Sequence, residues 1–138
     1  MNRQDNGLIA VLRIGYALAI LGMIIYAALS ARIAALPPLA PPTAASRAFL
    51  EALTKTVFFT PMLAATYLAG ACAMLFQRTA PLGIVLLAPP MVVIFFFHIF
   101  LTGMVVWGAA WAGILAVLAW AHRDAFKALV TFNGPARF

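Results

Sequence analysis

The residue whose type and setting most favour chemistry is His98, the one histidine inside a long apolar run. Phe96 and Phe97 precede it in a stretch that also holds Phe95 and Phe100. An imidazole titrates near physiological pH, so in an aromatic, apolar setting it can accept a proton or contact a quinone. The structural alternative is a neutral imidazole that hydrogen-bonds a neighbouring helix, with the phenylalanines in lipid contact and core packing.

Arg13 is the second candidate, because it is the only charge inside the first apolar run. A charged side chain at the centre of a bilayer costs about 2.5–3.5 kcal/mol on insertion scales, so its presence needs a reason. Either the guanidinium reaches back to the headgroups, or it faces the protein interior as a fixed positive charge for an anionic headgroup or ligand. We expect Arg13 and His98 near opposite faces of the membrane, and therefore not in one site.

The acidic residues are too scattered for acid–base catalysis. Asp5, Glu51 and Asp124 all lie outside the apolar runs, so no carboxylate pair is available for proton transfer. The sequence also has no Ser/His/Asp set, no glycine-rich phosphate loop and no metal-spaced His/Cys cluster. His122 follows the last apolar run, far from His98, so we expect neither a metal site nor a haem held by both histidines. The sequence thus leans away from an enzyme.

Composition indicates that the solvent around this chain is lipid. The 138 residues are 66% hydrophobic and only 9% charged, whereas soluble domains are about 45–50% apolar and about 25% charged. A soluble domain of this size has too little interior to hide so much apolar surface. The net charge of +6 comes from basic residues scattered near the ends of apolar runs, so nucleic acid is not an expected partner.

Four apolar runs are long enough to cross a bilayer: about residues 8–29, 56–76, 81–101 and 104–121. A hydrocarbon core of about 30 Å needs about 20 helical residues. Helices are expected because every backbone polar group must be paired internally, and because the runs do not alternate as barrel strands do. The predicted fold is therefore all-α, a transmembrane four-helix bundle with residues 1–138 as one membrane domain.

Residues 30–55 are the only long loop, and its prolines forbid a continuous helix there: Pro37, Pro38, Pro41 and Pro42. Thr43 or Ser46 can cap a new helix after them. Mixed polarity over residues 47–56 predicts an interfacial helix that leads into the second span. Pro61 predicts a kink in that span, because proline removes a backbone donor and clashes with the preceding turn.

The distribution of basic residues predicts the orientation. With four spans, one side of the membrane carries Arg3, Arg78, Arg123, Lys127 and Arg137. The other side carries only Arg32, Arg47 and Lys55. Cytoplasmic segments are enriched in Lys and Arg, so both termini are expected in the cytoplasm and the proline-rich loop on the opposite, periplasmic side.

Small residues recur at four-residue spacing on three of the spans. The sets are Gly15 and Ala19; Ala65, Ala69 and Ala73; and Gly108, Ala112 and Ala116. Such faces let helix backbones approach closely, and in lipid this packing holds helices together. They predict a compact bundle, or association with a second copy or another membrane protein.

The run from Arg78 through Pro81-Leu82 and Leu87-Ala88-Pro89 to Phe97-His98 resembles the third span of DoxX-like membrane proteins. Leu12-Arg13, Leu68-Ala69-Gly70 and the ending Ala121–Lys127 are also similar to that family. The resemblance implies a four-helix membrane bundle in a bacterial inner membrane. It also implies a link to membrane redox systems, since one relative is a thiosulfate:quinone oxidoreductase subunit.

The chain departs from this family at two polar positions. Relatives often carry Glu before the second-span Leu-Ala-Gly, where this chain has Thr66 or Tyr67, and Asn before the phenylalanine run, where it has Val93. These changes remove polar groups from the bundle interior. The departure weakens any expectation of a shared polar-site activity.

Three functions follow from these observations. The first is an accessory or scaffold subunit of a membrane complex, a redox complex if the family resemblance holds, bound through its small-residue faces. The second is an oxidoreductase subunit that binds quinone at His98, with Phe96 and Phe97 around it. The third is a small transporter or lipid-handling protein that uses Arg13, which the absence of an internal repeat or broken polar helices makes the weakest.

Overall fold

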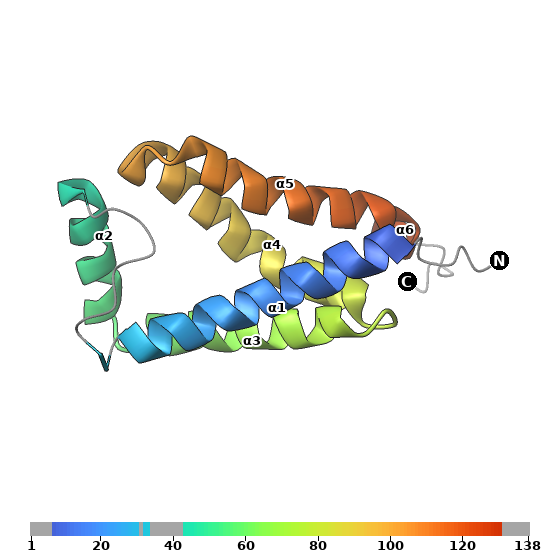
Figure 1. Cartoon of the computed structure of the whole chain (residues 1–138), viewed down its shortest axis with the longest axis horizontal. Coiled ribbons are helices and arrows are strands. Elements are labelled where there is room, and N and C mark those ends of the chain that lie inside the picture. The colour runs from blue at the N-terminus through green and yellow to red at the C-terminus, as the bar shows by residue number, and fades with distance from the viewer. Residues whose placement is uncertain (1–6, 31, 34–42, 131–138) are drawn as a thin grey trace, which may run out of the picture.

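The computed structural model describes residues 7–30, 32–33 and 43–130, and every regular element in these ranges is a helix (Figure 1). In chain order these are α1 (Gly7–Ser30), α2 (Ala44–Lys55), α3 (Phe59–Leu75), α4 (Ala80–Phe97), the π-helix η1 (His98–Thr102), α5 (Val105–Ala121) and α6 (Arg123–Val130). The all-α prediction is therefore confirmed for the described residues. Each predicted apolar run contains one long helix: α1, α3, α4 with η1, and α5.

Two of these helical segments are long and apolar enough to cross a membrane, namely α1 and the continuous segment Ala80–Thr102. A third candidate arises if α2 and α3 count as one span, although the two helices are bent by 95° at the break between them. The helix α5 is apolar but shorter, with 17 residues. Among the described residues, two to three candidate spans are thus compatible with a membrane protein.

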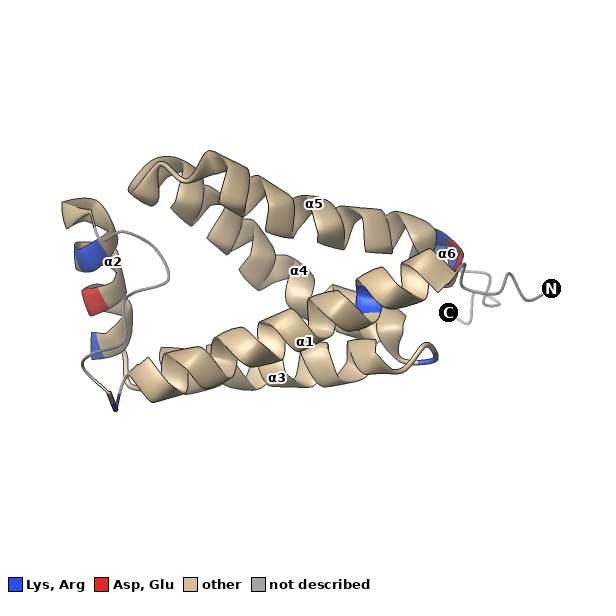
Figure 2. Cartoon of the chain, viewed as in Figure 1, with Lys and Arg blue, Asp and Glu red and all other residues tan. Residues whose placement is uncertain are grey.

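The long helices lie side by side in a ring of contacts, in which α1 touches α3 and α5, and α4 also touches α3 and α5. The start of α1, the α3–α4 turn and α6 share one end of the molecule, which we call the α6 end (Figure 1). The helix α2 and the η1–α5 turn lie at the other, the α2 end. Charged residues gather at the same two ends (Figure 2), and Arg13 is the one described charge within α1.

The densest packing is in the half of the molecule next to the α6 end. Met74, Leu87 and Leu118 are fully buried there. Tyr16 packs against Trp111 with ring centroids 5.3 Å apart, and its hydroxyl donates to the Trp111 carbonyl at 3.2 Å. Helices from distant parts of the sequence therefore share one core at this end.

The closest backbone approach is between α3 and α4. A Cβ added to Gly83 would lie 2.6 Å from the Gly70 carbonyl oxygen, so only glycine fits at this crossing. The predicted small-residue faces differ from one another: Gly15, Ala19 and Ala65 are exposed, whereas Gly108 is buried against His98. The contacts within the chain therefore include the start of the predicted face on α5 and lie beside the predicted faces on α1 and α3.

The helix predicted before the second span is present as α2, capped by Thr43; its place at a membrane interface stays a prediction. The Thr43 hydroxyl accepts from the Ser46 N–H at 3.0 Å, and the Ser46 hydroxyl accepts from the Thr43 N–H at 2.9 Å. The predicted kink at Pro61 is wrong, because α3 begins at Phe59 and proline in a first helical turn has no intrahelical hydrogen bond to lose. The bend falls instead before α3, and the prolines at 37–42 lie outside the described residues.

Candidate functional site

A cavity of about 420 Å³ lies at the α2 end, between the helix pairs α1–α3 and α4–α5. Its wall is formed by residues of α1, α2, α3, α4, η1 and α5. A second cavity of about 450 Å³ adjoins it, since Met23, Leu63, Tyr67 and Ile94 line both. The walls are almost entirely apolar, which suits a lipophilic molecule with few polar groups.

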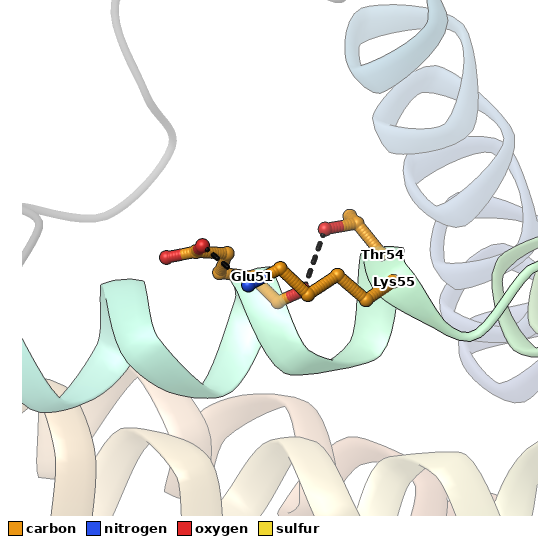
Figure 3. A network of polar contacts seen from close by, with 3 residues as sticks. All are labelled: Glu51, Thr54 and Lys55. Atoms are coloured by element: carbon orange, nitrogen blue, oxygen red, sulfur yellow. Dashed lines mark hydrogen bonds and ion pairs between the residues drawn. The ribbon is translucent and has the colours of Figure 1, made fainter.

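The amphipathic helix α2 forms one wall of this cavity. Its apolar residues Phe49, Leu50 and Leu53 line the space. Three of its polar residues lie on the side turned away from the helices beneath it: Lys55 pairs with Glu51 at 2.9 Å, and the Thr54 hydroxyl donates to the Glu51 carbonyl (Figure 3). Ser46 and Arg47, near the start of α2, line the cavity with the apolar residues. Such two-sided polarity is typical of a helix that lies at a membrane surface.

A hydrogen bond fastens the start of α2 to the π-helix. The Thr43 hydroxyl that caps α2 also donates to the carbonyl oxygen of Leu101 in η1. The helix α2 meets α3 at 95° and so lies across the end of the molecule. The Thr43–Leu101 hydrogen bond holds α2 in this position. The cavity wall formed by α2 is thus tied to the element that carries His98.

His98 is buried, with 8% of its surface exposed, and its side chain lines the cavity. Its Nδ1 lies 2.9 Å from the Ile94 carbonyl oxygen, one turn earlier on its own helix. The expected hydrogen bond to a neighbouring helix is therefore replaced by one within the helix. Because a carbonyl oxygen only accepts, Nδ1 carries the proton in this arrangement and Nε2 is the acceptor nitrogen of the neutral ring.

His98 is also the first residue of the π-helix η1. Single π-turns inside helices are rare and are often found at functional sites. A Cβ added to Gly108 would lie 2.8 Å from the Cβ of His98, so α5 presses directly against the base of the imidazole side chain. The position of the ring is thus fixed from two sides, by its own helix and by α5.

Aromatic rings surround the imidazole on the cavity side. Phe97 packs edge-on against His98 at 5.4 Å, and Phe49 from α2 lies 5.7 Å from Phe97. Phe96 does not line the cavity; it is 49% exposed and stacks on Phe100 at the outer surface. The structure therefore brings His98 and Phe97 together in the site and leaves Phe96 outside it.

Arg13 lies in the other half of the molecule and is buried, with 4% of its surface exposed. Its guanidinium donates to the carbonyl oxygen of Met74, in the last turn of α3. The Thr79 hydroxyl donates to the nearby Ala73 carbonyl at 2.7 Å. Carbonyls in a last turn lack intrahelical partners and carry partial negative charge. Arg13 therefore faces the protein interior and does not reach back to the headgroups. In the interior it caps the end of α3.

Three residues of the site were not identified from the sequence. Phe49 and Tyr67 reach the cavity from α2 and α3, and Trp107 lines it from α5. The mixed polarity of residues 47–56 was the one available signal for Phe49. Within the described residues no group of His, Cys, Asp and Glu can hold a metal ion.

Fold and site together define a helical protein whose apolar helices line a partly open, lipophilic cavity beside an amphipathic helix. Comparison of the chain with known protein families, with curated proteins and with solved structures finds no match. The resemblance to DoxX-like proteins accordingly stays a prediction.

Proposed function

We propose that this chain is a four-span membrane protein that binds a lipophilic small molecule, of the quinone class, in the cavity beside His98. The observation that carries the proposal is the cavity of about 420 Å³ with a buried histidine in its wall. Apolar and aromatic walls with one or two polar groups are the usual design of sites for such ligands. The resemblance of residues 78–101 to DoxX-like proteins, some of which serve membrane redox systems, agrees with this choice.

The binding experiment uses the protein in lipid nanodiscs and a quinone with a ten-carbon tail. Trp107 lines the cavity, so saturable quenching of tryptophan fluorescence reports occupancy. Because Nε2 of His98 is an acceptor, it can bond the O–H of the reduced, quinol form of this probe but not a quinone carbonyl. We therefore titrate the quinol form as well, and we expect His98→Ala to weaken quinol binding about fivefold, the value of one net hydrogen bond of about 1 kcal/mol. Absence of saturable binding by the wild type would refute the proposal, and equal affinity in His98→Ala would remove His98 from it.

The chain offers a matched control for this substitution. His122 has the same local geometry as His98, with its Nδ1 2.9 Å from the carbonyl oxygen of Leu118 one turn earlier. It lies at the α6 end and does not line the cavity. We therefore expect His122→Ala to bind the quinol form as the wild type does, which separates loss of the site from a general effect of removing a histidine.

The proposed topology places α1, α3, Ala80–Thr102 and α5 across a bacterial inner membrane, with both termini in the cytoplasm. The helices α3 and α5 have 17 residues each, about 25 Å of helix, slightly less than an average hydrocarbon core. The charged residues at both ends of the molecule support this orientation of the helices (Figure 2).

Cysteine labelling in intact cells tests the topology. Lys55 at the α2 end and Lys127 at the α6 end are exposed, and their ion pairs contribute little to stability. Each is changed to Cys in a Cys72→Ser background. A membrane-impermeant maleimide is expected to label Lys55→Cys in intact cells and Lys127→Cys only after permeabilisation; labelling of both from outside would contradict the proposed orientation.

An accessory role beside a membrane complex is the second candidate. The exposed small residues Gly15, Ala19, Ala65 and Ala69 favour it, because they leave room for another helix to approach closely. Crosslinking in native membranes from Gly15→Cys is the test. A detergent-purified monomer with no crosslinked partner would exclude this role and leave the ligand-binding proposal untouched.

A further inference from the structure

We infer that the cavity selects ligands by a hydroxyl group, which donates a hydrogen bond to Nε2 of His98. The inference rests on the proposed function, since it assumes that a lipophile enters the cavity. It specifies which polar group such a ligand must carry. A long-chain alcohol, a phenol or a quinol has the required O–H, whereas an ether or a quinone has only acceptor oxygens.

The first step is the assignment of the histidine proton. Nδ1 of His98 lies 2.9 Å from the Ile94 carbonyl oxygen, which cannot donate. The proton of the neutral ring therefore lies on Nδ1, and Nε2 presents a lone pair. His98 is more than nine-tenths buried and lines the cavity, so this lone pair is best satisfied by a donor inside the cavity.

The second step concerns the other polar groups around the space. The Ser46 hydroxyl donates to the Thr43 carbonyl at 3.1 Å, and the Thr102 hydroxyl donates to the His98 carbonyl at 3.2 Å. Both hydroxyl protons are thus used within the protein. Arg47 and Trp107 also bring N–H groups to the cavity wall, but none of the described residues donates a hydrogen bond to Nε2 of His98. A donor carried by the ligand is therefore the group that complements Nε2.

The third step concerns Tyr67, the other hydroxyl on the cavity wall. A phenolic O–H donates as well as accepts, so Tyr67 can serve any ligand oxygen, whether hydroxyl, ether or carbonyl. It therefore adds affinity without discriminating between these groups. Discrimination falls to His98, because an acceptor nitrogen rejects a ligand that offers only another acceptor.

The test uses dodecanol and its methyl ether, which differ in the hydroxyl proton and in one methyl group. Affinity is read from the rise in Tm of the protein in nanodiscs as the mole fraction of each probe increases. The nitrogen NMR resonance of Nε2 in His98 reports the contact itself. We expect the wild type to bind the alcohol roughly two- to tenfold more tightly than the ether, the range for one neutral hydrogen bond.

Two variants assign the preference to one residue. His98→Phe keeps an aromatic ring but has no acceptor, and we expect it to bind alcohol and ether equally. Tyr67→Phe is the control: it weakens both probes alike and keeps the preference for the alcohol. The reverse pattern, with the preference lost in Tyr67→Phe and kept in His98→Phe, would overturn the assignment.

Measurements on the wild-type protein distinguish failure of the proposed function from failure of this inference. If the quinone and both probes leave Tm unchanged, the ligand-binding proposal fails and this inference fails with it. If the quinone and both probes bind, but alcohol and ether bind equally and the Nε2 resonance does not move, the cavity takes lipophiles without selecting a hydroxyl. In that case the inference alone is refuted.

Discussion

Gly83→Ala tests the close contact between α3 and α4. The added Cβ would lie 2.6 Å from the Gly70 carbonyl oxygen and 2.9 Å from the Met74 backbone nitrogen. Overpacking usually costs 1–3 kcal/mol, and we expect about 3 kcal/mol here because backbone atoms cannot rotate aside. The better helix propensity of alanine recovers at most about 1 kcal/mol. The net loss in the free energy of unfolding is therefore about 2 kcal/mol.

The assay is reversible unfolding of the detergent-solubilised protein by added SDS, followed by circular dichroism and by tryptophan fluorescence. Gly22→Ala on α1 is the matched control, because a Cβ there has nothing within 4 Å. We expect it to leave the transition unchanged or to raise it slightly. Equal midpoints for Gly83→Ala and Gly22→Ala would show that α3 and α4 do not meet at this crossing, and would refute the packing described for the α6 end.

Two further substitutions test the two ends of the molecule. Arg13→Leu removes a charged donor from the Met74 carbonyl, so we expect it to lower the free energy of unfolding by about 1.5–3 kcal/mol; Arg13→Lys should recover part of this, and equal stability of all three proteins would contradict the capping role. Gly108→Ala puts a Cβ 2.8 Å from that of His98, so we expect binding of the quinol form to weaken about fivefold, as on losing one hydrogen bond. Gly113→Ala is the control, because a Cβ there has nothing within 4 Å, and it should bind normally. If Gly108→Ala binds as tightly as Gly113→Ala, the position of the His98 ring does not determine the affinity.

The helices could be predicted from the sequence because hydropathy is a local property. Each of the four apolar runs contains a helix whose ends lie within about three residues of the predicted ends. The start of α2 was also a local signal, since Thr43 and Ser46 both follow the prolines and either hydroxyl could cap a helix there; the structure has Thr43 as the cap. The position of the α2–α3 bend was not predicted, because proline at the start of a helix and proline inside one look alike in the sequence.

The site depends on contacts between distant residues, and these could not be predicted in detail. His98 and its aromatic surroundings were recognised from composition, but Phe96 and Phe97 are adjacent and only the helix rotation decides which one faces the cavity. Phe49 reaches Phe97 only because α2 turns back across the end of the molecule. The capping role of Arg13 likewise needs the end of α3 beside it, which no single-sequence pattern reveals.

The cavity of about 420 Å³ is partly open at the surface of the protein, and this decides how selectivity arises. In the proposed membrane setting lipid tails can enter it, so they are the competing occupant. Apolar walls hold a lipid tail as well as a ligand tail, so they add little net affinity. Lengthening the tail of a probe should accordingly change its mole-fraction affinity little, whereas removing its hydroxyl should change it severalfold. A steep dependence on tail length would show instead that the cavity is sealed from lipid, and that its apolar walls and not His98 choose the ligand.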